Sequence, residues 1–75
     1  MESKWLDFYN MTPKGRKTKI INVWNKKMDC YLGNIQWSGA WRQYAFMPMP
    51  DREFSKGCLE DIIVFIKILM GERRK

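Results

Sequence analysis

The 75-residue chain contains no histidine and only two cysteines, Cys30 and Cys58. Without histidine, no Ser–His or Cys–His pair is present to activate a nucleophile. The two cysteines are not spaced as ligands of a structural zinc site, and the chain has no phosphate-binding loop and no glycine-rich dinucleotide motif. We therefore predict a protein that is not an enzyme and that holds neither a metal ion nor a cofactor.

The chain also lacks a long apolar segment. Its most apolar run, residues 58–70, contains Glu60, Asp61 and Lys67, whereas a membrane span needs about 20 apolar residues. The opening Met-Glu-Ser-Lys does not resemble the start of a secretory signal. We expect no membrane partner and a cytoplasmic location, with both thiols reduced and packed as small hydrophobic groups.

Acidic residues are absent from residues 14–27, although the whole chain has 8 acids against 14 lysines and arginines, a net charge of +6. This stretch contains six cations: Lys14, Arg16, Lys17, Lys19, Lys26 and Lys27. A second cluster, Arg73-Arg74-Lys75, ends the chain. Such charge favours anionic partners, but a solvated face that keeps a small protein soluble is an equal alternative.

The remaining pattern predicts an α+β fold of one domain. β-forming runs at 18–25, 30–37 and 41–46, joined by short turns, indicate an antiparallel meander of three or four strands. Pro48 and Pro50 then end the sheet. A C-terminal helix of about four turns follows, with Ser55 as its N-cap and Gly71 as its C-cap. Glu60 and Asp61 are expected in its first turn.

Successive side chains of a strand point to opposite faces of the sheet, so their positions in the sequence predict which face each one occupies. Tyr31, Ile35 and Trp37 are expected to share one face, and Gly33 between them indicates a bulge or a close backbone approach. In the last strand, alternation places Arg42 with Tyr44 and Phe46.

An apolar stripe on the helix is expected to cover the sheet. It consists of Leu59, Ile62, Ile63, Ile66, Leu69 and Met70. Val64 and Ile68 lie off this stripe and predict a contact with a second copy, giving a homodimer, or with a partner protein.

Residues 1–17 are interpreted as an N-terminal aromatic arm that precedes a single α+β domain at 18–75. Trp5, Phe8 and Tyr9 have the i, i+3, i+4 spacing of a short helical turn. Thr12-Pro13-Lys14-Gly15 then breaks the chain. The arm either docks on the domain or stays loose.

The segment from Trp37 to Tyr44 mixes large rings with a guanidinium around a tight turn. An arginine fork can pair with a phosphate while rings stack on a base. We therefore predict a ligand site for a nucleotide or nucleic acid, with Lys26 and Lys27 on the neighbouring hairpin. Its residues are Trp37, Trp41, Arg42, Tyr44, Lys26 and Lys27. A separate basic patch consists of Lys14, Arg16, Lys17 and Lys19. The alternative is that the rings form the core and Arg42 is an ordinary surface residue.

A resemblance to a known family rests on residue spacing across about residues 18–70. The matching residues are Leu32-Gly33-x-Ile35-x-Trp37, Trp41-Arg42-x-Tyr44-x-Phe46-x-Pro48, Phe54, and Cys58-Leu59-x-Asp61-Ile62-x-x-Phe65-Ile66. The pattern resembles a family of small phage and prophage proteins of unassigned activity, and residues 1–17 fall outside it. The resemblance implies host takeover or counter-defence in the host cytoplasm. The leading hypothesis is binding of a nucleotide signal or nucleic acid. The alternative is an inhibitor that binds a host defence protein through the aromatic arm and the Val64–Ile68 face. A structural virion component is a third class.

Overall fold

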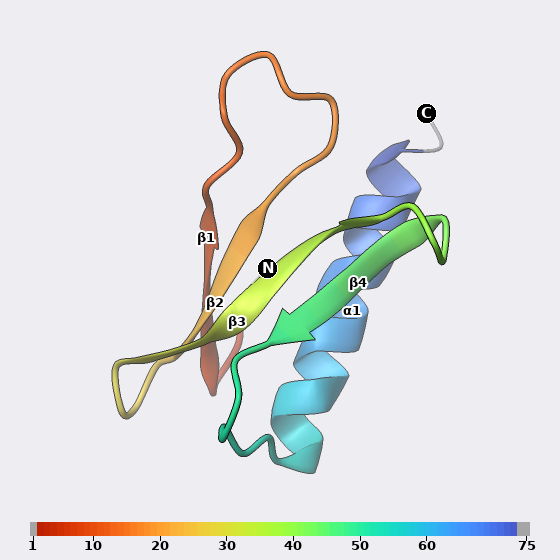
Figure 1. Cartoon of the computed structure of the whole chain (residues 1–75). Coiled ribbons are helices and arrows are strands. Elements are labelled where there is room, and N and C mark those ends of the chain that lie inside the picture. The colour runs from red at the N-terminus through yellow and green to blue at the C-terminus, as the bar shows by residue number, and fades with distance from the viewer. Residues whose placement is uncertain (1, 74–75) are drawn as a thin grey trace.

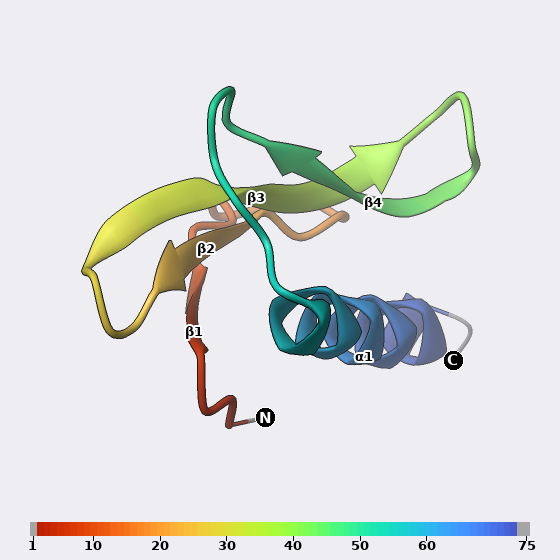
Figure 2. The same cartoon turned by 90° about the horizontal axis from the view of Figure 1, so that it is seen from below.

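The computed structural model describes residues 2–73 and shows a four-stranded antiparallel sheet with one helix packed on one face (Figures 1 and 2). The elements are β1 Leu6–Asn10, β2 Ile21–Asn25, β3 Cys30–Ser38, β4 Gln43–Pro48 and α1 Lys56–Arg73. The strands lie side by side in chain order, β1-β2-β3-β4. The predicted α+β meander with one C-terminal helix is therefore confirmed. Of the C-terminal basic cluster, Arg74 and Lys75 lie outside the described residues.

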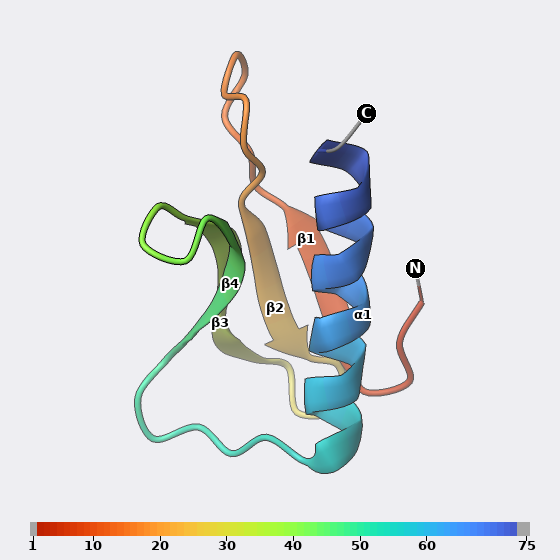
Figure 3. The same ribbon diagram turned by 90° about the vertical axis from the view of Figure 1, so that its right-hand side faces the viewer.

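The core lies between α1 and the sheet face that α1 covers (Figure 3). Alternation turns Ile21 and Val23 of β2 to this face, and Ile21 pairs with Ile35 of β3. Burial of such aliphatic side chains stabilises the fold by roughly 1.5–3 kcal/mol each. The buried hydrophobic residues are Leu6, Ile21, Val23, Leu32, Ile35, Tyr44, Ile62 and Leu69.

The N-terminal segment is a strand, so the predicted helical turn around Trp5, Phe8 and Tyr9 is wrong. β1 pairs with β2, and Phe8 lies opposite Val23. The Phe8 ring stacks on Phe65 of α1, with 4.4 Å between ring centroids and 19° between ring planes. Tertiary packing of this ring decides the conformation, because a helical turn this short has little stability of its own.

Ser3 fixes the start of β1 to the rest of the molecule. Its hydroxyl oxygen accepts the backbone N–H groups of Trp5 at 3.1 Å and Leu6 at 3.0 Å, and its O–H donates to the carboxylate of Asp61 on α1. Its carbonyl accepts the Lys26 ammonium at 2.7 Å. The Ser3 residue is itself only 6% exposed, and its bonds tie β1 to both α1 and the β2–β3 hairpin.

Helix α1 begins as predicted but is rotated and longer than predicted. The N–H of Cys58 donates to the Ser55 hydroxyl at 3.2 Å, as an N-cap requires. The first turn contains no acidic residue, and the helix continues past Gly71 to Arg73, so both of those expectations are wrong. Leu59 and Ile63 of the predicted stripe are 45% and 51% exposed. The stack of Phe65 on Phe8 turns a neighbouring face of the helix toward the sheet.

Gly33 lies in a β-bulge, as the sequence predicted. Val23 pairs with Gly33 while the next residue of β2 pairs with Tyr31, so Leu32 is the extra residue on β3. Gly33 has φ +148°, and a Cβ atom there would lie 2.3 Å from the carbonyl oxygen of Met47 on β4. Only glycine fits both this backbone conformation and this close approach.

The bulge also changes which face Tyr31 occupies. Tyr31 pairs with Trp24 on the open face of the sheet, with 5.6 Å between ring centroids. Leu32 and Ile35 are buried on the opposite face. The expectation that Tyr31 shares a face with Ile35 is therefore wrong, because an inserted residue reverses the alternation at that point.

We predict that Gly33→Ala lowers the free energy of unfolding by about 2 kcal/mol or more, because the new methyl group meets backbone atoms and alanine disfavours this φ. Chemical unfolding followed by circular dichroism measures the change. Gly39→Ala is the matched control, since a Cβ atom at Gly39 has no neighbour within 4 Å and should alter stability by less than about 0.5 kcal/mol. Equal stability of the two variants would contradict the steric account.

Ser3→Ala should lower the free energy of unfolding by about 1–3 kcal/mol, since it leaves two N–H groups and a carboxylate without their buried partner. Thermal unfolding of the full chain measures this effect. Glu2→Ala, one residue away and exposed, serves as the control and should leave the melting temperature unchanged. A Ser3→Ala variant as stable as the wild type would show that β1 docks without this anchor.

Candidate functional site

The meander brings two loops and one helix end together at one end of the sheet. The β1–β2 loop, residues 11–20, and the β3–β4 turn, residues 39–42, both lie at the end where α1 terminates (Figures 1 and 3). The β2–β3 hairpin lies at the opposite end, because successive hairpins of a meander alternate. With nine residues in β3, the two ends are about 25 Å apart at the usual rise per residue. We call the first of these the basic end.

Lys26 and Lys27 lie on the β2–β3 hairpin, far from the basic end. The expectation that they flank Trp41 and Arg42 is therefore wrong. The Lys26 ammonium is 2.7 Å from the Ser3 carbonyl oxygen and 3.8 Å from the Asp7 carboxylate, so Lys26 anchors the N-terminal segment.

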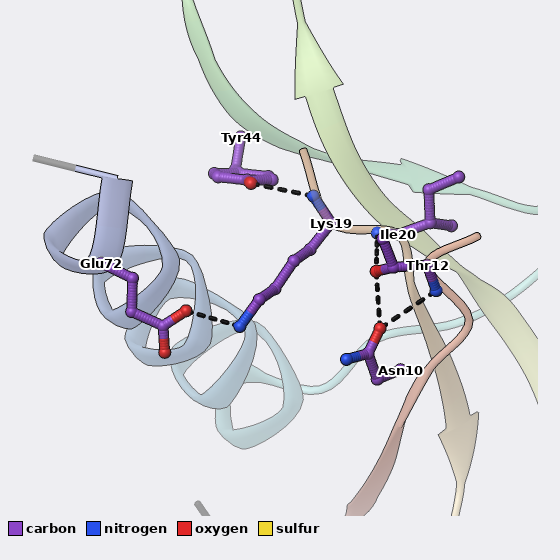
Figure 4. Close-up of polar contacts among 6 residues, drawn as sticks. All are labelled: Asn10, Thr12, Lys19, Ile20, Tyr44 and Glu72. Carbon is purple, nitrogen blue, oxygen red and sulfur yellow. Dashed lines mark hydrogen bonds and ion pairs between the residues drawn. The ribbon is translucent and has the colours of Figure 1, made fainter. Parts of the chain in front are cut away.

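Trp37 and Tyr44 face α1 rather than solvent. Tyr44 is only 5% exposed, and its ring meets Trp37 edge-on with 5.5 Å between centroids. The Tyr44 hydroxyl oxygen accepts the backbone N–H of Lys19 at 3.0 Å (Figure 4). The Arg73 guanidinium lies over Trp37, 4.0 Å from the ring centroid. Tyr44 is therefore a core residue, and Trp37 is partly buried and packs against the core.

Trp41 and Arg42 lie in the β3–β4 turn, since β4 begins only at Gln43. The expectation that they belong to the strand is wrong. Trp41 is 73% exposed, and Arg42 has a left-handed backbone with φ +54°. Asp29 and Asp51 share that conformation, but the short polar side chain of aspartate favours it through local hydrogen bonds, which arginine does not form. Backbone strain of this kind is concentrated at functional sites.

The β1–β2 loop is held closed at its base by a short hydrogen-bond chain (Figure 4). The Asn10 side-chain oxygen accepts the N–H and the hydroxyl of Thr12 at 3.0 and 2.6 Å. The Thr12 hydroxyl oxygen in turn accepts the N–H of Ile20 at 2.9 Å. This closed base presents the exposed cations of the loop to solvent: Lys14, Arg16 and Lys17.

A cleft of about 340 Å³ separates this loop from the C-terminal turns of α1. It is lined by Lys17, Lys19, Tyr44, Leu69, Glu72 and Arg73. The lining contains three cations and one carboxylate, and the Lys19 ammonium pairs with Glu72 at 2.7 Å (Figure 4). Among residues 2–73, Lys17 forms no ion pair. The cleft is therefore electropositive.

Two other hollows are less suited to an anion. The hollow on the open face of the sheet is lined by Tyr9, Met11, Asn22, Trp24 and Asp29, so its charged group is a carboxylate. The lining of the hollow near the start of α1 contains one cation, Lys27, and one carboxylate, Glu53. Of these three hollows, the cleft at the basic end is therefore the best suited to an anion by its charge.

The sequence interpretation missed two features of this end. It did not connect Arg73 with Trp37, and it did not bring the basic patch to the Trp41–Arg42 turn. The signal that could have found the second feature was the alternation of hairpins, which places the first and third connections of a meander at the same end. Among residues 2–73, no group of three or more Cys, Asp or Glu side chains is placed to hold a metal ion. In the same residues, α1 is not apolar enough to cross a membrane.

Comparison with known proteins shows that the chain is similar to a small phage protein over most of its length. The "Uncharacterized 9.3 kDa protein" of Acholeplasma phage L2 is 34% identical over 73 residues, which are 97% of this chain and 94% of the phage protein. The chain belongs to a family of small phage proteins. Because 97% of this chain is covered, the similarity includes β1, although residues 1–17 were expected to fall outside the resemblance. No family model and no solved structure matches the chain.

Proposed function

We propose that this phage protein is a non-enzymatic binder of nucleic acid, and that the basic end is its binding surface. The observation that carries the proposal is the Trp41–Arg42 turn. An exposed tryptophan stands beside an arginine in a strained conformation, at the end where the exposed loop cations also lie. The cations supply attraction to phosphates, and the exposed ring supplies stacking worth about 1–3 kcal/mol per base.

The distribution of charge favours a polymer over a single nucleotide. Lys14 and Arg16 project from the loop beyond the lining of the cleft, while Lys17 and Arg73 line it. A nucleotide seated in the cleft would leave the outer cations unused. A phosphate backbone that crosses the basic end could contact the loop and the cleft together.

We place this activity in the host cytoplasm, as part of counter-defence by the phage. The alternative function, inhibition of a host defence protein, is supported by the exposed apolar side chains of α1, among them Val64 and Ile68. The N-terminal segment offers this alternative less surface than expected, since Leu6 is buried and Phe8 packs on α1.

Replacement of Lys14, Arg16 and Lys17 with alanine should weaken binding to a fluorescent single-stranded oligonucleotide. The slope of log affinity against log salt should fall by up to about 2, since each phosphate contact contributes about 0.7 for a single strand. Lys19 stays in place, because its loss would leave Glu72 unpaired. Anisotropy titrations at several salt concentrations measure the slope.

The matched control removes three exposed cations from the opposite end: Lys4, Lys27 and Lys56. The two triple variants have the same net charge, so only the position of the charge differs. Equal loss of affinity in both variants would show that the attraction depends on the net charge alone and not on the basic end. Tight, salt-insensitive binding of a mononucleotide with no oligonucleotide binding would move the proposal to a nucleotide signal.

Arg42→Gly separates the function of this residue from its structural cost. Glycine accepts a left-handed backbone, so the free energy of unfolding should stay level or rise by up to about 1 kcal/mol. The oligonucleotide affinity should fall by about 10-fold or more, as expected for loss of a charge-assisted contact. Unfolding and anisotropy measurements on this one variant test both effects. Unchanged affinity would remove Arg42 from the site.

A further inference from the structure

Helix α1 carries apolar side chains on the face that points away from the sheet. Leu59, Ile63, Val64 and Ile68 are between 41% and 51% exposed. At 3.6 residues per turn they lie to either side of Glu60 and Lys67, which are opposite the buried Ile62 and Leu69. The sheet covers only the opposite side of the helix (Figure 2). Exposed apolar side chains grouped on a second side are characteristic of a second contact.

The exposed residues on this face form a sequence that reads alike in both directions. Between Leu59 and Ile68 the exposed positions are, in order, apolar, acidic, apolar, apolar, basic and apolar: Leu59, Glu60, Ile63, Val64, Lys67 and Ile68. The midpoint lies between Ile63 and Val64. Reversal of the direction leaves every apolar position apolar and exchanges Glu60 with Lys67.

We propose that this face binds a second copy of the same chain, with the two α1 helices antiparallel and a two-fold axis beside the Ile63–Val64 midpoint. In that arrangement Glu60 of one copy is level with Lys67 of the second copy, and the reverse pair forms by symmetry. The apolar residues between them meet at the axis. Such a self-complementary patch is the requirement of a two-fold interface.

The charges of Glu60 and Lys67 favour a second copy of the chain as the partner, and they favour the antiparallel direction. In a parallel pair, Glu60 would be level with Glu60 of the second copy, and Lys67 with Lys67, so both contacts would repel. Within one helix, Glu60 and Lys67 are seven residues apart, about 10 Å along the axis, and do not face each other as i, i+4 pairs do. Glu60 and Lys67 can therefore pair with each other only between two copies of the chain.

The patch spans ten residues of one helix, so the interface is small and the association is weak. The dimer should therefore form over protein concentrations of about 1 µM to 1 mM. Sedimentation equilibrium of the full chain over this range measures it.

Charge reversal provides the decisive test. Glu60→Lys alone and Lys67→Glu alone should each weaken self-association by about 10-fold or more, because each places like charges at both contacts. An equimolar mixture of the two variants should associate as a heterodimer at least as tightly as the wild type, since both contacts are then opposite in charge. The double variant should likewise recover self-association.

Two further variants locate the association on this face of α1. Val64→Lys should give a monomer with an unchanged melting temperature, since Val64 does not belong to the core. Met28→Lys, a 74% exposed apolar position on the β2–β3 hairpin, should leave association unchanged. A wild type that remains monomeric at about 1 mM, or single variants whose mixture associates no better than either alone, would overturn the proposal.

Discussion

The close approach of β3 to β4 at Gly33 is the constraint on which the arrangement of this molecule depends. At that point the Met47 carbonyl oxygen occupies the space where any other residue would carry a Cβ atom. The same position is the bulge that inserts Leu32 into the strand. By reversing the alternation, the bulge places both Leu32 and Ile35 in the core and sends Tyr31 to the open face. A strand of regular alternation through these residues would have buried one tyrosine and exposed one leucine.

The position of this bulge also determines what remains at the basic end. Downstream of Gly33 the alternation is regular, so Trp37 faces the helix and pairs with Tyr44 across β3 and β4. Tyr44 then uses its hydroxyl to hold Lys19, which fixes the end of the β1–β2 loop. The rings that complete the core thus also position the loop cations. Trp41, in the turn between these strands, contributes little to packing, which leaves it free for a ligand.

Local signals in the sequence were sufficient for the elements that depend on local chemistry. Ser55 was predicted as an N-cap because its hydroxyl can serve a helix N–H, and Gly33 was predicted to mark a bulge because glycine in a strand usually has such a reason. The sequence could not show the tertiary contacts that decided the rest. Phe8 joins a strand because Phe65 offers it a stacking partner, and the same stack rotates α1 away from its predicted face.

The candidate site was predicted only in part, again because the sequence does not show tertiary contacts. Residue types indicated an anionic ligand, but four of the six chosen residues are placed elsewhere or used otherwise. Tyr44 lies in the core, Trp37 packs against the core, and Lys26 and Lys27 lie at the far hairpin. The error at the hairpin came from treating neighbours in sequence as neighbours in space. In a meander, the neighbour of a turn is the connection two strands away, which here is the basic loop.

The two proposed surfaces occupy different parts of the molecule and can operate together. The cleft uses the inner, C-terminal side of α1 at Leu69, Glu72 and Arg73, whereas the self-complementary patch ends at Ile68 on its outer side. In an antiparallel pair, the C-terminal ends of the two helices point in opposite directions. The two basic ends would then lie at opposite extremes of the dimer, where each meets a separate stretch of phosphate backbone. Two weak sites joined in this way bind a long polymer more tightly than either site alone, which is a physical use for a dimer in a protein too small to carry two such sites itself.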